Sequence, residues 1–146
     1  MKTPIRSFLL LLAFPALCGA QNPDPVLAKA ATEKGAVVTD SGLVFLSLKE
    51  GNGASPTAGN VVRVHYRGTF PGGKEFDSSY ARKQPAEFPL NRVIPCWTEG
   101  VQKIKVGGKA KLTCPAAIAY GARGAPPDIP PNATLLFEVE LLGIVR

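Results

Sequence analysis

The sequence predicts an α+β domain in which an antiparallel β-sheet of five to six strands wraps around one short α-helix. Two observations support this fold class. From residue 41 onward, several segments alternate apolar and polar residues, which is typical of half-buried strands. A single segment beginning at Pro95 has the apolar spacing of a helix instead.

Residues 1–20 have the layout of a secretory signal peptide: a basic start, an apolar run and small residues before Gln21. The apolar run from Phe8 to Leu17 is too short to cross a bilayer, which needs ~20 residues. Acylation of Cys18 is the alternative, but Leu17 is bulkier than the residue expected before an acylated cysteine. We therefore expect an exported protein, either periplasmic or fully secreted, with no stable membrane insertion after cleavage.

Residues 21–40 are expected to form a partly ordered leader, because they are small, polar and interrupted by prolines. Within them, Val26 to Lys34 has the composition for two helical turns, a length that is marginal for an isolated helix. Residues 41–146 then form the folded domain, which is enough chain for one modest hydrophobic core.

Four segments of this domain are predicted strands. Val61 to Arg67 is the clearest, because Val62, Val64 and Tyr66 alternate with polar residues and define a buried face. The other three are Leu43 to Lys49, Lys109 to Cys114, and Thr134 to Val145. Pro89 interrupts the segment after Phe88, which suggests a strand at a sheet edge or a bulge.

The predicted helix follows Pro95 and carries the only tryptophan of the chain. Trp97, Val101 and Ile104 recur at helical spacing and form one apolar stripe. Gly107-Gly108 ends the segment. A large aromatic residue at the start of this helix is expected to point into the domain and to form the floor of an apolar pocket.

No conventional catalytic set can be assembled from these residues. His65 is the only histidine, and the strand alternation places it on the outward, exposed face, where no serine and acid complete a triad. One histidine and two distant cysteines do not resemble a zinc site. The densest basic stretch, Lys103 to Lys111, is interpreted as solvated surface, so we expect no metal, cofactor or nucleic acid.

Several strings of residues closely resemble the FKBP-type peptidyl-prolyl cis-trans isomerases. These strings are Val64-His65-Tyr66-Arg67-Gly68, Phe76-Asp77-Ser78-Ser79, Val93-Ile94-Pro95-Cys96-Trp97, Ala119-Tyr120-Gly121 and Ile129 to Leu141. The resemblance runs from about Ser41 to Val145 and is greatest to the catalytic domain of the exported, Mip-like bacterial branch. The long dimerising region of that branch has no counterpart here, so a monomer is expected.

The resemblance implies a role for each pocket residue. Trp97 would be the floor, and the walls would be Tyr66, Phe76, Phe88, Val93, Ile94 and Phe137. The catalytic contacts would come from the Ile94 backbone N–H, from the Tyr120 hydroxyl, and from Asp77 through hydrogen bonds within the pocket. Family members also bind macrolide immunosuppressants in this pocket.

The implied function is isomerisation of X-Pro bonds in unfolded or partly folded exported polypeptides. The apolar pocket would stabilise the twisted amide without covalent chemistry, so no cofactor is needed. The alternative is a non-catalytic peptide-binding module, or a holdase chaperone that uses the same pocket. Ala125 and Asp128 differ from some relatives in the rim loop, where they could alter substrate preference.

Cys96 stands where many family members have glycine. It begins the predicted helix, and Cys114 faces inward on its strand. Because two cysteines remain after signal cleavage in an exported protein, we hypothesise a Cys96–Cys114 disulfide. Two buried free thiols are the alternative.

Overall fold

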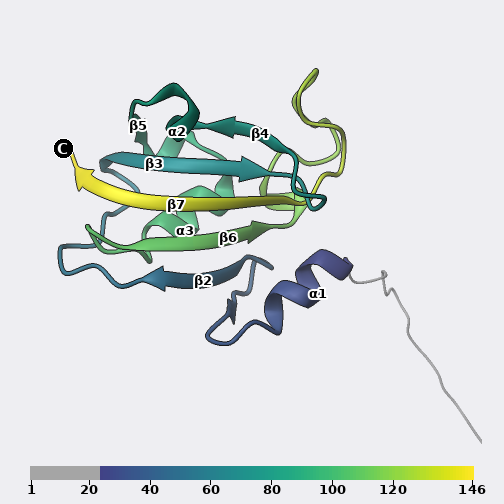
Figure 1. Ribbon diagram of the computed structural model, residues 1–146, viewed down its shortest axis with the longest axis horizontal. Coiled ribbons are helices and arrows are strands. Elements are labelled where there is room, and N and C mark those ends of the chain that lie inside the picture. Colours follow the sequence, from purple (N-terminus) through teal and green to yellow (C-terminus); the bar gives the residue numbers. More distant parts are fainter. Residues whose placement is uncertain (1–23) are drawn as a thin grey trace, which may run out of the picture.

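The structure, a computed structural model, describes residues 24–146, so the predicted signal peptide lies outside the described residues (Figure 1). The strands are β1 (Val37–Val38), β2 (Val44–Lys49), β3 (Val61–Thr69), β4 (Glu75–Ser78), β5 (Ala86–Pro89), β6 (Lys109–Cys114) and β7 (Leu135–Ile144). The helices are α1 (Pro25–Ala31), α2 (Ser79–Arg82) and α3 (Pro95–Val101), with 3₁₀ turns η1 (Leu90–Arg92) and η2 (Ala116–Ile118). Within this part of the chain, no helix is long and apolar enough to cross a membrane.

The strands form one antiparallel sheet in the order β1-β2-β6-β7-β3-β4, with β5 also paired to β3. The α+β class with an antiparallel sheet is therefore confirmed. Residues 24–146 contain seven strands. The two that the alternation pattern did not indicate are short: β1, of two residues, and β4, of four. Figure 1 shows α3 behind the sheet.

One edge of β3 receives two short strands in succession. β4 pairs with its residues 67–69, and β5 pairs with its residues 61–64. Helix α2 joins them, and the chain turns back at Lys83, which has a left-handed φ of 57°. Pro89 is the last residue of β5 and pairs with Val61, consistent with the predicted edge position.

The hydrophobic core lies between α3 and the sheet. Trp97, Val101 and Ile104 are all buried. The helix is shorter than predicted, however, because it ends at Val101 and Ile104 lies in the turn that follows it. The three side chains face the buried residues of β3, β6 and β7, which are Val62, Val64, Tyr66, Ala110, Leu112, Cys114, Leu135, Phe137, Val139 and Leu141. Gly100 permits the close approach of α3 to β6, because a Cβ there would lie 2.9 Å from the Leu112 side chain.

A disulfide joins Cys96, near the start of α3, to Cys114, at the end of β6. Both residues are fully buried, and their Cα atoms are 5.9 Å apart. The hypothesised pairing is thus present in the structure. It links the helix that carries Trp97 directly to the sheet.

The leader residues from Asp24 onward contact the domain. Asp24 caps α1 by accepting a 2.8 Å hydrogen bond from the Val26 N–H, and its other carboxylate oxygen accepts a bond from the Thr134 hydroxyl. Helix α1 lies against β2 and β6. Just after it, Glu33 forms a 2.7 Å ion pair with Lys111 of β6.

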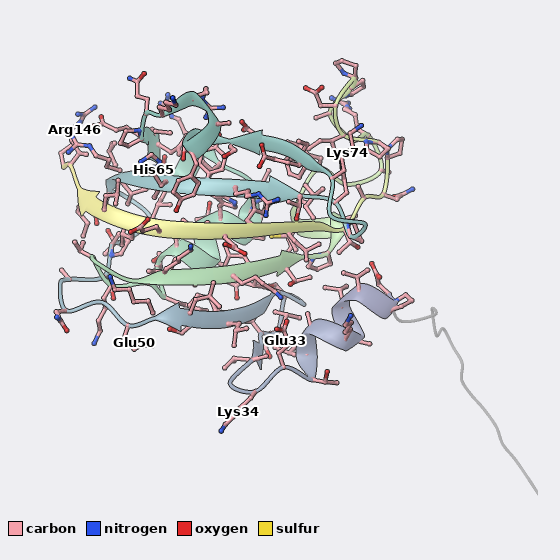
Figure 2. All side chains as sticks on the ribbon, in the orientation of Figure 1. Glu33, Lys34, Glu50, His65, Lys74 and Arg146 are labelled. Atoms are coloured by element: carbon pink, nitrogen blue, oxygen red, sulfur yellow. A yellow bond between two sulfur atoms is a disulfide. The ribbon has the colours of Figure 1, made fainter. Side chains whose placement is uncertain are left out.

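His65 lies on the outward face of β3, away from the core, as expected from the alternation (Figure 2). It is half-buried rather than exposed, because the Tyr80 ring of α2 stacks on it at 4.7 Å. Its Nδ1 lies 2.8 Å from the hydroxyl oxygen of the buried Ser79. The alternation within β3 could not indicate this burial, because the covering Tyr80 ring belongs to helix α2.

Candidate active site

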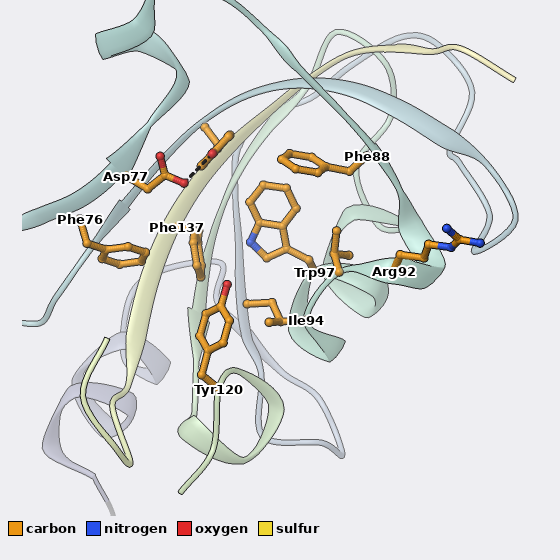
Figure 3. Close-up of a pocket in the computed structure, with 10 residues that line it drawn as sticks. Phe76, Asp77, Phe88, Arg92, Ile94, Trp97, Tyr120 and Phe137 are labelled. Atoms are coloured by element: carbon orange, nitrogen blue, oxygen red, sulfur yellow. Dashed lines mark hydrogen bonds between the residues drawn. The ribbon is translucent and has the colours of Figure 1, made fainter. Parts of the chain in front are cut away.

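A cavity of about 430 Å³ opens between the sheet, α3 and the loop after β6 (Figure 3). It is lined by Tyr66, Phe76, Asp77, Phe88, Arg92, Val93, Ile94, Trp97, Tyr120 and Phe137. Every residue predicted for the pocket is in this lining. Arg92 is an additional member that the sequence did not indicate.

Trp97 forms the base of the cavity, and its side chain is held by three other rings. The rings of Tyr66, Phe88 and Phe137 each contact it edge to face, with centroid distances of 5.2, 5.5 and 5.5 Å. This geometry is the preferred arrangement for aromatic pairs. Only 4% of Trp97 is exposed, and its indole N–H has no hydrogen-bond partner among residues 24–146. Packing against the three rings therefore holds the indole in place.

The wall formed by Phe76 and Phe137 depends on Gly68 of β3. The two rings meet edge to face at 5.6 Å over this residue. A Cβ on Gly68 would lie 2.6 Å from the Phe76 ring and 3.0 Å from the Phe137 ring. Glycine is thus required for both phenylalanines to reach the cavity.

Tyr66 and Asp77 line one end of the cavity, and Arg82 joins them in a polar cluster there. The Tyr66 hydroxyl donates to Asp77 Oδ2 at 2.6 Å, and Arg82 donates to Asp77 Oδ1 at 2.6 Å. Arg82 also donates to the Tyr66 hydroxyl oxygen at 2.9 Å, and its guanidinium lies 5.7 Å from the centre of the Tyr66 ring. Sequence reasoning missed Arg82, because only α2 brings residues 77 and 82 together.

This cluster sets the ionisation of its members. Burial alone would raise the pKa of the Asp77 carboxyl, but hydrogen bonds from Tyr66 and Arg82, together with the Arg82 charge, lower it below its usual value. Burial and the bond to Asp77 raise the pKa of Tyr66. At neutral pH the cluster therefore holds a carboxylate, a neutral phenol and a guanidinium.

Tyr120 enters the cavity from the other side, on the loop that follows η2. Figure 3 shows its hydroxyl pointing inward between Phe137 and Ile94. Burial, and then the negative charge of Asp77, raise the pKa of this phenol. Tyr120 is thus a neutral hydrogen-bond donor at physiological pH, although 40% of the residue remains exposed.

Ile94 is the N-cap of α3, and Pro95 follows at the first helical position. Its carbonyl accepts hydrogen bonds from the N–H groups of Trp97 and Thr98, at 2.9 and 3.1 Å, which fixes the local backbone. Within residues 24–146, no backbone acceptor is found for the Ile94 N–H itself. The side chain of Ile94 lines the cavity beside this amide.

The remaining predicted positions lie away from the cavity lining. Ala125 forms a backbone bridge with Ile129 in the loop after Tyr120, and Asp128 is exposed at the turn between them. In the described residues, no group of three or more His, Cys, Asp or Glu side chains could hold a metal ion. The lining of the site combines aromatic surface with the hydrogen-bonded cluster around Asp77.

The chain has an antiparallel sheet packed on one helix, with an aromatic cavity between them. Proteins of known family share this arrangement. Residues 53–142 match the family model of the FKBP-type peptidyl-prolyl cis-trans isomerases, and the chain belongs to this family.

The similar proteins include FKBP-type peptidyl-prolyl cis-trans isomerase FkpA of Aeromonas hydrophila, which is 52% identical over 120 residues (82% of this chain and 44% of the relative). The FKBP-type 22 kDa isomerase of Escherichia coli is 50% identical over 119 residues (82% and 58%). The chain thus spans about half the length of the curated relatives it matches.

Two solved structures are also similar. The crystal structure of FkpA from Escherichia coli superposes with a TM-score of 0.79 at 49% identity, over 81% of this chain and 55% of that one. A peptidyl-prolyl cis-trans isomerase from Pseudomonas syringae superposes with a TM-score of 0.77 at 36% identity, over 83% of this chain and 89% of that one.

Proposed function

We propose that this protein is a peptidyl-prolyl cis-trans isomerase that accelerates rotation about X-Pro bonds in unfolded or partly folded polypeptides. The observation that carries the proposal is the apolar cavity over Trp97, which has two polar groups, Asp77 and Tyr120, at its edge. Membership of the FKBP-type family supports the same activity.

The reaction suits a site of this kind because no covalent bond has to break. Rotation about an X-Pro bond takes tens to hundreds of seconds unaided, since the planar amide must lose its resonance. The twisted state has lost the charge separation of the planar amide. An apolar cavity therefore favours the twisted state relative to the planar one. Shortening the step to milliseconds requires a ~10⁴-fold acceleration, or about 5.5 kcal/mol.

The proposed roles divide this stabilisation among three kinds of contact. The proline ring would lie on Trp97, enclosed by the aromatic walls. The Ile94 N–H would donate to a substrate carbonyl, which is supported by its freedom from backbone bonds within the described residues. The Tyr120 hydroxyl would donate to a second carbonyl near the proline. Oriented donors that are better placed for the twisted state than for the planar one would raise kcat.

Asp77 would act through the polar cluster and would not transfer a proton. Its carboxylate holds the Tyr66 hydroxyl and faces the cavity, where its field would act on the rotating carbonyl. Its low pKa supports an ionised group throughout the physiological range. No proton transfer is needed for rotation, so Asp77 would be an electrostatic and positioning group.

The test is the rate of cis–trans interconversion in a short X-Pro peptide at micromolar protein. Acceleration is expected, and an excess of a macrolide immunosuppressant should abolish it by filling the cavity. Fluorescence of Trp97, the single tryptophan, reports peptide binding in the same samples. Binding without acceleration would instead identify a non-catalytic binding module or a holdase.

The biological setting is part of the proposal. Cleavage of residues 1–20 would release an exported, monomeric isomerase that acts on exported proteins, in the periplasm or outside the cell. The N-terminal mass of the protein recovered from each compartment tests the export. Light scattering of that material tests the monomer, and a molar mass near twice the chain mass would contradict it.

A further inference from the structure

We propose that Arg92 selects peptides that carry an acidic side chain next to the X-Pro pair, and that it thereby sets a sequence preference of this site. The inference rests on the proposed isomerase function. It adds a specificity-determining residue to that function, and it concerns the end of the cavity farthest from Asp77.

Arg92 is the last residue of η1, and its side chain is exposed while lining the cavity. Figure 3 shows its guanidinium at the opposite end of the site from Asp77, beyond Trp97. The two ends of the cavity therefore differ in charge. A peptide whose proline lies over Trp97 has one neighbouring residue at each end.

The charge on Arg92 has no counter-ion among residues 24–146. The ion pairs of the described chain use Arg63, Arg67, Arg82, Lys109 and Lys111. Glu87, the acid on the strand just before η1, forms a 2.7 Å pair with Arg63. Asp77 is held by Arg82 at 2.6 Å. The cavity thus has one end with a neutralised carboxylate and one end with an uncompensated cation.

A path for the peptide leads past this cation. Val93 lines the cavity and also a second, more open hollow of about 620 Å³, which Asn91 of η1 and Thr98 of α3 line as well. The two depressions are therefore adjacent at Val93, and a chain that leaves the cavity there passes Arg92. The one acid lining the second hollow is Glu99, which accepts a hydrogen bond from Ser41. An acidic substrate residue is thus favoured beside Arg92 and disfavoured in the second hollow, beside Glu99.

The expected effect is modest because the pair would form at an exposed site. Exposed ion pairs are worth little individually, which corresponds to a preference of roughly two- to fivefold for glutamate over glutamine. Salt screens such a pair, with a Debye length of about 8 Å at physiological ionic strength. The preference should therefore decline as salt is added, whereas apolar contacts to the proline should not.

The experiment compares kcat/KM for X-Pro peptides in a protease-free isomerisation assay. Glutamate, glutamine or lysine is placed in turn at each position flanking the X-Pro pair. The wild-type protein is expected to prefer glutamate over glutamine at one flanking position, and to turn over the lysine peptide more slowly than either. Arg92→Gln should reduce the glutamate-to-glutamine ratio to about one, and Arg92→Glu should reverse it.

Lys103→Gln is the matched control, because Lys103 is exposed, absent from both linings, and carries the same charge. This variant should keep the wild-type ratio, which separates a local contact from an effect of net charge. Equal rates for the glutamate and glutamine peptides at every position in wild type would overturn the inference. So would a glutamate preference that survives in Arg92→Gln.

Failure of the isomerase proposal has a different signature. In that case the neutral glutamine peptide would not be accelerated at all by the wild-type protein. The charge preference would then be read from peptide dissociation constants, measured through Trp97 fluorescence. A glutamate preference in affinity that is lost in Arg92→Gln supports the inference, and its absence overturns it.

Discussion

The Tyr66 hydroxyl donates a 2.6 Å hydrogen bond to Asp77 Oδ2, from strand β3 to its neighbour β4. Arg82 donates both to the other carboxylate oxygen and to the Tyr66 hydroxyl oxygen, so the three side chains form a closed triangle. Each group in this triangle limits the rotation of the other two. The polar end of the cavity is therefore oriented before a peptide arrives, which would reduce the reorganisation needed in the proposed reaction.

Replacing Asp77 tests the role of this triangle. Asp77→Ala should lower kcat/KM by roughly tenfold, because a loss of ~1.4 kcal/mol in transition-state stabilisation corresponds to that factor. The thermal midpoint should change little, since the Asp77 side chain is 41% exposed and exposed ion pairs contribute within ~1 kcal/mol. Isomerisation assays and thermal unfolding on the same preparation separate the two effects. A wild-type rate would exclude Asp77 from the reaction.

The pH profile follows from the lowered pKa of Asp77. The pKa of Asp77 is lower in the folded protein than in the unfolded chain, where it is about 3.9. The interactions of the charged carboxylate are therefore present above pH 3.9 and are lost as the pH falls through the pKa of the folded state. Because the pKa values of Tyr66 and Tyr120 are raised, kcat/KM should be flat from about pH 5 to pH 9. If protonation of Asp77 causes kcat/KM to fall at low pH, this fall should be absent in Asp77→Asn. A fall with the same midpoint in Asp77→Asn would assign it to another group.

Replacing Tyr120 tests the second proposed donor. Tyr120→Phe should lower kcat by roughly two- to tenfold, the range expected for one neutral hydrogen bond, with a smaller effect on KM. Because 40% of the residue is exposed, the fold should retain its stability. Steady-state kinetics beside circular dichroism provides the check. If KM rises while kcat stays constant, Tyr120 only binds the substrate.

The sequence predicted those parts of the fold that repeat with a simple period. Alternation in Val61 to Arg67 identified the buried face of β3, because one side of that strand meets the core and the other does not. The spacing of Trp97 and Val101 identified α3 for the same reason, whereas Ile104 is buried in the turn after the helix. The two-residue β1 carries no such pattern, since its pairing with β2 comes from the tertiary fold.

The candidate site was predictable where it is apolar and less so where it is polar. Trp97 and Phe137 follow from burial patterns, and the family resemblance supplied Asp77 and Tyr120. Arg82 and Arg92 carry no periodic signal, because an exposed arginine is compatible with almost any surface position. Their places depend on helix α2, which brings Arg82 to Asp77, and on the 3₁₀ turn η1, which ends with Arg92 beside the cavity.

The disulfide between Cys96 and Cys114 should contribute about 3 kcal/mol to the free energy of unfolding, the chain-entropy value for a loop of 18 residues. Cys96→Ala/Cys114→Ala should unfold at a correspondingly lower denaturant concentration than the oxidised wild type. Adding reductant should shift wild type toward the variant and leave the variant unchanged. Mass spectrometry after alkylation in denaturant, without reductant, should show no label on Cys96 or Cys114. Two labels would mean that the bond does not form.

Ser79 should be a stability determinant behind the site. Ser79 is fully buried, and its hydroxyl oxygen accepts a 2.7 Å hydrogen bond from the backbone N–H of Tyr66. The Tyr66 side chain is one of the three members of the polar triangle. Ser79→Ala removes that acceptor and leaves a buried N–H unpaired, which should cost about 1–3 kcal/mol in denaturant unfolding. Tyr80→Phe is the matched control on the same helix. It removes a 3.1 Å bond to Glu140 at an exposed site and should cost no more than ~1 kcal/mol. Equal stability losses in the two variants would contradict the importance of the buried bond.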